Sequence, residues 1–213
     1  FTEYLRELAD QRRVEPRDDL LSALVAVEEA GEHLTEAELY ATCALLLVAG
    51  HETTINLIGN GTLALLRHPD QLALLKADPT LMPNAVEELL RYDGPVERAT
   101  LRFAATDLAL GGQQIRRGEA LAVVLGSANR DDAQFDQPDT LDLRRDNSRH
   151  LAFGYGVHYC VGAPLARMEG RIALTTLLRR LPNLRLAAPV EELTWRFNPI
   201  LRGMNHLPVA WDV

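Results

Sequence analysis

The strongest chemical signal in the chain is a single cysteine among glycines and rings, in the segment HLAFGYGVHYCVG at residues 150–162. Gly154, Gly156 and Gly162 indicate backbone that another group approaches closely. Cys160 stands at the start of the next predicted helix, whose N-terminus favours a thiolate. A thiolate among backbone donors and flat apolar rings suits an axial ligand of haem iron. For a cysteine taken alone, a buried core residue is the alternative.

A second polar pattern, AGHETT at residues 49–54, interrupts an apolar helical stretch. His51 and Glu52 begin like a zinc-protease helix, but Ile55 occupies the position where that motif needs its second histidine, so the metal interpretation fails. Gly50 weakens the helix here, and the Thr53 hydroxyl can bond an open backbone carbonyl. Both a functional polar notch and an ordinary kink fit this pattern.

A third pattern, EELLR at residues 87–91, places two opposite charges three positions apart. Glu88 and Arg91 therefore share one face of a helix and can form an ion pair. An exposed pair of this kind contributes only ~0–1 kcal/mol.

The elements that must position these residues are helical in the first half of the chain. Helices are predicted over residues 2–13, 18–31 and 81–94, and a long one runs from Thr35 to the residue before Pro69. Thr35 followed by Glu38 is a capping-box start. The long helix has roughly 33 residues and a length of about 50 Å. Its glycines are expected to interrupt it: Gly50, Gly59 and Gly61.

The second half of the chain is predicted to mix strands, an irregular segment and one more helix. Residues 96–129 carry short apolar runs separated by glycines, which indicates strands and hairpins. Residues 129–149 are polar and irregular, residues 163–183 return to a helical pattern, and terminal strands follow Asn183. The long irregular segment is typical of a functional loop.

Composition limits the classes of function. The 213 residues are 47% hydrophobic and carry a net charge of −8 without a basic stripe, which argues against a general nucleic-acid binder. Cys43 and Cys160 are the two cysteines, and their separation argues against a disulfide framework and for a reducing, cytoplasmic setting. The longest apolar run, CALLLVAG, is far shorter than the ~20 residues that cross a bilayer, so no membrane association is predicted.

The string around Cys160 resembles the haem-thiolate signature of the cytochrome P-450 family, phenylalanine–glycine–x–glycine–x–basic–x–cysteine–x–glycine. The fixed positions are filled here by Phe153, Gly154, Gly156, His158, Cys160 and Gly162. This resemblance implies a haem b cofactor with Cys160 as its iron ligand and with Phe153, Gly154 and Gly162 against it. It implies that His158 contacts a haem propionate, and Arg102 matches a region where the family commonly has a second propionate partner. A solvated strand end is the alternative for Arg102.

The other two patterns also match the family. By resemblance, Glu52 and Thr53 are the acid–alcohol pair that the family carries on its central helix above the haem. Glu88 and Arg91 match a glutamate–x–x–arginine motif whose charges are buried and joined by a further arginine. That arginine is expected to be Arg145, with Arg144 as the alternative.

We therefore expect residues 1–213 to form a mainly helical α+β fold, the C-terminal haem-binding part of a bacterial, soluble-type P-450. This part has a long central helix, small β-sheets and a cysteine-ligand loop, and the N-terminal half of the family's fold is absent. By resemblance, the parent enzyme inserts one oxygen atom from O2 into a small organic substrate with electrons from a ferredoxin- or flavodoxin-type donor. The residues expected to line the substrate are Val48, Ala49, Val96, Ile200 and Leu201.

Two other functions remain open. The chain could be a truncated, non-catalytic haem-binding or interaction fragment. A peroxide-using haem enzyme ranks third, because such variants often lack the acid–alcohol pair, which is intact here. The apolar character of the long helix further predicts that this chain associates with itself, binds the missing half or holds haem weakly.

Overall fold

The computed structural model describes residues 2–29, 34–146 and 149–212. The chain divides into two compact units, residues 1–52 and residues 53–213. Helix α3 (Glu36–Arg67) contributes its first half to one unit and its second half to the other. Each unit has its own buried apolar cluster.

The first unit is helical. Helices α1 (Thr2–Val14) and α2 (Leu20–Glu29) pack against each other. Asp19 accepts the backbone N–H of Ser22 at 2.8 Å, and the Arg12 guanidinium binds the same carboxylate at 2.7 Å. The start of α2 is thus held by a side chain from the turn before it. The core of this unit is a small apolar cluster of Leu5, Ala9, Val25, Leu39 and Tyr40.

The predicted long helix is present as α3, and its capping box forms as expected. The Glu38 carboxylate accepts the Thr35 N–H at 2.8 Å, and Thr35 Oγ1 accepts the Glu38 N–H at 3.3 Å. The expected interruption at the glycines is wrong, because α3 is continuous from Glu36 to Arg67. Backbone hydrogen bonds on both sides outweigh the roughly 1 kcal/mol preference against each glycine.

By length and composition, α3 is apolar enough to cross a membrane, although its longest uninterrupted apolar run is short. This is weak support for a membrane helix, because the central helices of soluble proteins pass the same test. Asn56 and Asn60 are buried in the second half of α3, and the Asn60 amide donates to the carbonyls of Asp93 and Arg202 at 3.2 and 3.0 Å. These polar contacts with the rest of the second unit are typical of a core helix.

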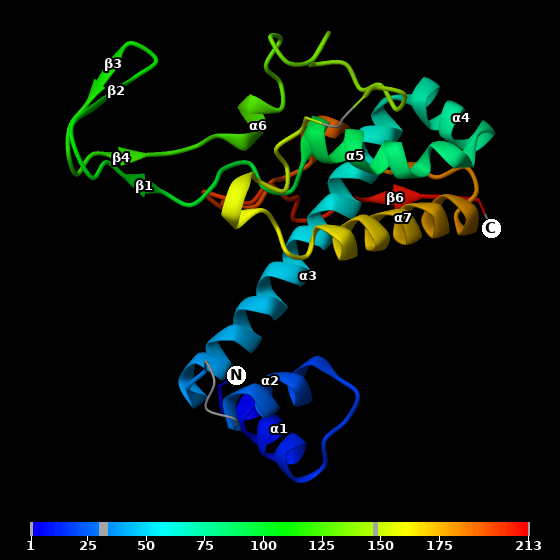
Figure 1. Ribbon diagram of the computed structural model, residues 1–213. Coiled ribbons are helices and arrows are strands. Elements are labelled where there is room, and N and C mark those ends of the chain that lie inside the picture. Colours follow the sequence, from blue (N-terminus) through cyan, green and yellow to red (C-terminus); the bar gives the residue numbers. More distant parts are fainter. Residues whose placement is uncertain (1, 30–33, 147–148, 213) are drawn as a thin grey trace. The chain divides into compact units, whose positions relative to one another are not determined.

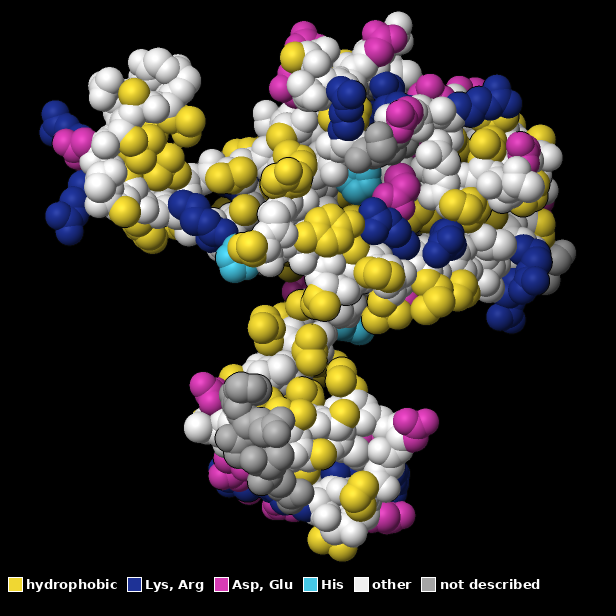
Figure 2. Space-filling view, in the orientation of Figure 1, with side chains coloured by type: hydrophobic (Ala, Val, Ile, Leu, Met, Phe, Trp, Pro, Cys, Tyr) yellow, Lys and Arg dark blue, Asp and Glu magenta, His cyan; other side chains and the backbone are white. Residues whose placement is uncertain are grey.

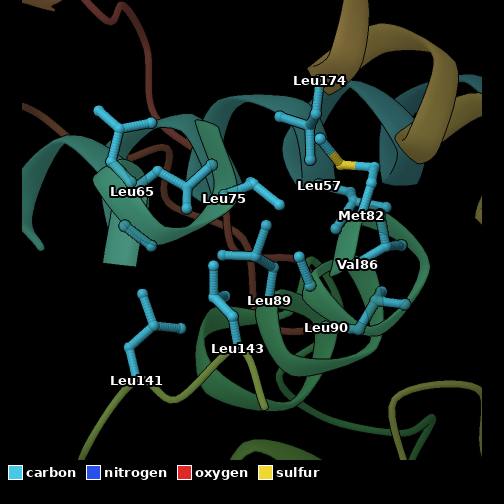
Figure 3. Close-up of a cluster of buried hydrophobic side chains, with 13 residues drawn as sticks. Leu57, Leu65, Leu75, Met82, Val86, Leu89, Leu90, Leu141, Leu143 and Leu174 are labelled. Atoms are coloured by element: carbon cyan, nitrogen blue, oxygen red, sulfur yellow. The ribbon is translucent and has the colours of Figure 1, made fainter. Parts of the chain in front are cut away.

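In the second unit, α5 (Met82–Asp93) and α7 (Ala163–Arg180) lie beside the C-terminal part of α3, with α4 (Pro69–Ala77) and η1 (Pro79–Leu81) completing the helical side (Figure 1). The helix expected at residues 81–94 is thus present, whereas α4 was not foreseen. Figure 3 shows how the helices and the irregular segment share one core. Its buried members are Leu57, Ala64, Leu65, Leu72, Leu75, Met82, Ala85, Val86, Leu89, Leu90, Leu141, Leu143 and Leu174.

Two glycines in this core explain why these helices pack so closely. A Cβ on Gly61 would lie 3.2 Å from the Leu89 side chain, and a Cβ on Gly170 would lie 3.1 Å from Leu57 and 3.3 Å from Val86. Gly61 therefore provides space at the contact of α3 with α5, and Gly170 does so at the contact of α7 with α3 and α5. Their role is close helix packing, for which the absent side chain is required.

The strands are short and form three antiparallel pairs. β1 (Arg102–Phe103) pairs with β4 (Ala120–Leu121), β2 (Leu108–Leu110) with β3 (Gln113–Ile115), and β5 (Arg185–Leu186) with β6 (Val209–Ala210). Gly111 and Gly112 both have positive φ, as a two-residue hairpin turn requires. Short helical turns complete the unit as α6 (Leu125–Ala128), η2 (Gly156–His158) and η3 (Val190–Glu192). The described part of residues 130–149 has no helix or strand, as predicted.

Candidate active site

The segment around Cys160 is a closed loop that ends at the start of α7. The Cys160 N–H donates to the Phe153 carbonyl at 2.9 Å, and the Tyr159 N–H donates to the Gly156 carbonyl at 3.0 Å. Gly154 and Gly156 have φ of +75° and +73°, which other residues rarely adopt, so the first two glycines are explained by backbone geometry. Gly162 has a φ of −83°, and a Cβ there would meet only the Cys160 sulfur at 3.8 Å. Backbone conformation therefore does not require a glycine at position 162, and the close approach of another group to it stays a prediction.

The Cys160 side chain is exposed, and large apolar side chains of the same loop lie open to solvent. Val157 is 98% exposed, and Tyr155 and Val161 are each 88% exposed. Such a surface around a thiol fits a large, flat, apolar group with a metal ion at its centre, which is the chemistry of a haem. Among the described residues, no group of three or more His, Cys, Asp or Glu side chains could hold a bare metal ion.

Cys43 is less exposed than Cys160. It is half-buried against the apolar cluster of the first unit. Burial raises the pKa of its thiol above the ordinary value. Because metals bind the thiolate, this shift disfavours metal ligation by Cys43.

Glu52 and Thr53 occupy consecutive half-buried positions of α3, at the boundary between the two units. Each makes an interaction, so neither side chain is without a partner. The next residue ties α3 to the helix that follows the cysteine, because Thr54 Oγ1 donates to Glu169 Oε2 at 2.9 Å. This contact joins residues 115 positions apart, and sequence reasoning did not find it.

Glu88, Arg91 and Arg145 are brought together in one hydrogen-bonded network. Glu88 and Arg91 form a bidentate pair, with Nε–Oε2 and Nη2–Oε1 distances of 2.7 and 2.9 Å and both side chains fully buried. Arg145 Nε lies 3.2 Å from Glu88 Oε1, whereas the Arg144 side chain is exposed. The backbone N–H of Asp142 also donates to Glu88 at 2.9 Å.

The remaining donors of Arg91 bind the irregular segment. They reach the carbonyls of Asn129, Pro138 and Thr140 at 2.8 to 3.2 Å. Asn129 in turn accepts the Leu151 N–H at 2.7 Å through its Oδ1. The buried charges thus hold the loop that leads to the cysteine.

Glu87, the neighbour of Glu88, belongs to a second charged group that sequence reasoning missed. The Arg167 guanidinium binds it at 2.7 and 2.9 Å, and His150 Nε2 lies 2.9 Å from its Oε2. Partial burial by itself raises the pKa of Glu87, but the hydrogen bonds from His150 and Arg167 outweigh it and lower the pKa to about 2. The same pair raises the pKa of Arg167 above its ordinary value. The Glu87 carboxylate is therefore ionised at neutral pH.

The two cations expected at the cofactor are both exposed. His158 ends the short helix η2 beside the cysteine, and Arg102 lies in β1 with its Nη1 2.7 Å from Thr100 Oγ1. Both are in positions where a cation can meet an anionic group that arrives from solution.

The residues expected to line the substrate fall in two places. Val96 and Leu201 pair in an isolated antiparallel bridge, and the Glu97 N–H donates to the Ile200 carbonyl at 2.9 Å, so three of the five lie together in the second unit. Val48 and Ala49 are exposed on α3 within the first unit. Figure 2 shows hydrophobic side chains along the visible face of α3, and the exposed ones of this stretch are Leu45, Leu46, Leu47, Val48 and Ile55.

Comparison with known proteins identifies the class. The family model described as Cytochrome P450 matches residues 1–78 and 75–183. Cytochrome P450 107B1 of Saccharopolyspora erythraea is 53% identical over 98% of this chain and 52% of its own length. The cytochrome P450 monooxygenase PikC of Streptomyces venezuelae is 53% identical over 98% of this chain and 50% of its own. The solved structure of the tirandamycin C-bound P450 monooxygenase TamI superposes with a TM-score of 0.94 at 46% identity, covering 99% of this chain and 53% of that one.

The chain belongs to the cytochrome P450 family, and its fold is that of the family. It spans about half the length of the curated relatives it matches, and the matched part is their C-terminal half. Haem is the cofactor of this family, which acts on organic substrates with O2 and a redox partner.

Proposed function

We propose that this chain is the haem-ligating part of a monooxygenase that inserts one oxygen atom from O2 into a small organic substrate, as part of a longer polypeptide. The observation that carries the proposal is the exposed Cys160, held by its N–H bond to Phe153 in a loop with an open apolar surface. The names of relatives such as PikC, a monooxygenase, support it.

The cofactor we propose is haem b, with Cys160 as the ligand of its iron. Phe153, Gly154 and Gly162 would pack against the ring, and His158 and Arg102 would pair with its two propionates, which need cationic partners. When bound, the haem supplies the electron-transfer and O2 chemistry. The chain's contribution is a charged ligand with fixed orientation, because the Cys160 N–H is already engaged with Phe153.

Glu52 and Thr53 are the residues we propose for proton delivery. A carboxyl group gives and regains a proton, and an adjacent hydroxyl can both donate and accept a hydrogen bond. Their consecutive positions on α3 keep an acid and a hydroxyl within one turn of the helix, which supports the proposal. Val48, Ala49, Val96, Ile200 and Leu201 offer apolar side chains for an organic substrate, and we propose that they line its site.

The partners we propose are a ferredoxin- or flavodoxin-type electron donor and either the remaining polypeptide or a second copy of this chain. The bacterial origin of the curated relatives supports a bacterial, cytoplasmic enzyme. The exposed apolar stretch of α3 favours cover from further polypeptide. For residues 1–213 alone we therefore propose haem binding without coupled turnover, so a truncated haem-binding or interaction fragment is the alternative function.

The test of the ligand is Cys160→Ser in the complete polypeptide, with Cys43→Ser as the matched control. Cys160→Ser should abolish the red-shifted Soret band of the reduced carbonyl complex, because serine provides no thiolate. Cys43→Ser should keep the band, since Cys43 packs against the core of the first unit. A band that survives in Cys160→Ser contradicts the assignment.

The test of proton delivery is Thr53→Ala in the same polypeptide. Substrate should still bind, because a methyl group in place of the hydroxyl barely changes the volume. Product formed per reduced cofactor consumed should fall, and the missing electrons should appear as peroxide, because the hydroxyl that orders the proton donor is gone. Thr42→Ala, a half-buried threonine of α3 in the first unit, is the control. A ratio equal to that of the control removes Thr53 from the mechanism.

A further inference from the structure

Behind the cysteine loop, side chains from α5, α7 and the loop itself surround a cavity of about 340 Å3. We define the Glu87 cluster as Glu87, His150, Phe153, Tyr159 and Arg167, which line this cavity together with Asn84 and Asp146. Among these, only Phe153 is a fixed position of the signature around Cys160. Glu87 contacts His150, 63 positions away in the chain, and Arg167, 80 positions away.

Arg167 makes contacts to three members of the cluster at once. Its Nε and Nη2 bind Glu87 at 2.7 and 2.9 Å, and its Nη1 donates to the Tyr159 hydroxyl at 3.1 Å. Its guanidinium carbon lies 4.5 Å from the centroid of the Phe153 ring. The planar guanidinium has the shape for a bidentate pair and a stacked ring together, which a lysine ammonium lacks.

His150 provides a further contact to the Glu87 carboxylate. The backbone N–H of Ala152 donates to His150 Nδ1 at 3.1 Å, so Nδ1 is an acceptor and Nε2, which lies 2.9 Å from Glu87 Oε2, is the nitrogen that donates to the carboxylate. The His150 side chain is 4% exposed. The carboxylate therefore receives donors from both the cysteine loop and α7, and its position fixes that of Arg167.

The cluster reaches Cys160 through two neighbours. Phe153, under the guanidinium, gives its carbonyl to the Cys160 N–H at 2.9 Å. Tyr159, bound by the same guanidinium, is the residue before Cys160. Between Phe153 and Tyr159 lie the two glycines with positive φ, whose backbone has the most freedom to lose on ordering.

We propose that Arg167, oriented by Glu87 and His150, is a positioning residue that fixes the loop of Cys160 by holding Phe153 and Tyr159. This inference rests on the proposed function for its consequence: a fixed loop sets the direction and electron-donating strength of the thiolate. Without the contacts of Arg167 to Phe153 and Tyr159, the hydrogen bond from the Cys160 N–H to the Phe153 carbonyl opens more often. The neighbouring helices keep their own core.

The direct test is amide hydrogen exchange of the peptide covering residues 153–162, measured in the complete polypeptide with and without haem. Arg167→Gln and Arg167→Lys are compared with Arg179→Gln and Arg179→Lys, which make the same changes at an exposed arginine of α7. We expect exchange of this peptide to rise about tenfold in both Arg167 variants. Neither glutamine nor lysine can keep both the bidentate pair with Glu87 and the stacking on the Phe153 ring. A peptide from α5 should change by less than about twofold, well below that tenfold rise.

Two results overturn the proposal. One is equal exchange of residues 153–162 in the Arg167 and Arg179 variants. The other is a rise that affects α5 and the loop alike, which is the behaviour of a purely structural residue. Where Arg167→Gln does not accumulate as folded protein, Arg167→Lys, which keeps the charge, decides the question by the same comparison.

A second measurement connects the loop to the cofactor. In the haem-loaded Arg167 variants, the haem reduction potential should shift and a smaller fraction should show the red-shifted carbonyl Soret band, while the Arg179 variants match the unmodified protein. Changed exchange with unchanged spectra and potential overturns the link to the thiolate. A failure of the proposed function gives a different result, namely a red-shifted Soret band that survives Cys160→Ser. The exchange measurement without haem does not depend on whether Cys160 is the iron ligand.

Discussion

Two adjacent carboxylates on α5 serve different regions of the molecule. Glu88 is fully buried, and its carboxylate is bound by Arg91, Arg145 and the backbone N–H of Asp142. Glu87, turned about 100° around the same helix, is partly exposed and faces the cavity behind the cysteine loop. One network holds the irregular segment, and the other holds the loop that carries the thiol. A single helix thus supports a closed structural core and an open chemical surface.

The comparison shows where change is tolerated. The Glu88 and Arg91 side chains have no exposed surface, so each depends on its partners. Around Cys160 the loop side chains are open to solvent, so their loss affects what the surface can bind more than it affects folding.

The largest expected effect is from Arg91→Ala. It leaves the Glu88 carboxylate buried without its bidentate partner and removes the Arg91 donors from the carbonyls of Asn129 and Pro138, whereas the Thr140 carbonyl keeps Arg145, so we expect the free energy of unfolding to fall by about 3–5 kcal/mol. Denaturant unfolding measures the loss. Arg144→Ala, an exposed neighbour of the network, is the control and should cost less than about 0.5 kcal/mol. Equal losses in the two variants would show that burial of the network contributes nothing.

A smaller loss of unfolding free energy is expected when low pH protonates the Glu87 carboxylate. Its folded pKa of about 2 lies below the value of 4.5 for an unpaired glutamate, so its contribution is fully present above pH 4.5 and is lost as the pH falls through 2. The amount is about 3 kcal/mol at most. His150 and Arg167 face the carboxylate from the loop and from α7, and Asp146 lines the same cavity.

Unfolding free energies of the unmodified protein and of Glu87→Gln, measured across this pH range, check the prediction. The difference between the two should shrink as the pH falls from 4.5 towards 2. Glu191→Gln, which changes an exposed carboxylate in η3, should give a curve parallel to that of the unmodified protein. A constant difference for Glu87→Gln would mean that the carboxylate is not stabilised by its partners.

The smallest effect on stability is expected from Val157→Ser in the cysteine loop. Val157 is 98% exposed, so its loss should change the unfolding free energy by less than about 0.5 kcal/mol. Haem affinity in the complete polypeptide should nevertheless fall several-fold, because an apolar contact is replaced by a hydroxyl. Haem titration measures this, and Val14→Ser, at an exposed valine of α1, is the control. Unchanged affinity would remove this side of the loop from the cofactor site.

Local patterns in the sequence predicted much of the fold. The capping box at Thr35, the long apolar helix and the one-face spacing of Glu88 and Arg91 depend on residues within one or two turns of each other, and the structure contains all three. The signature around Cys160 indicated the family, which the comparisons confirm. The roles of Cys160, Glu52 and Thr53 remain predictions. The glycines of α3 do not interrupt it, and sequence spacing alone does not distinguish a helix break from a close helix contact such as that of Gly61, nor from open space such as that beside Gly50.

Only the tertiary structure decided which distant residues meet. Arg145 rather than Arg144 binds Glu88, 57 positions away in the chain, and Thr54 donates a hydrogen bond to Glu169, 115 positions away. The Glu87 cluster forms because α5, α7 and the cysteine loop all contribute side chains to the lining of one cavity. Each of these residues is an ordinary surface charge or hydroxyl by its local sequence. Partner choice among charged side chains is set by chain packing, which buries some pairs and leaves others in water, and no local spacing encodes that difference.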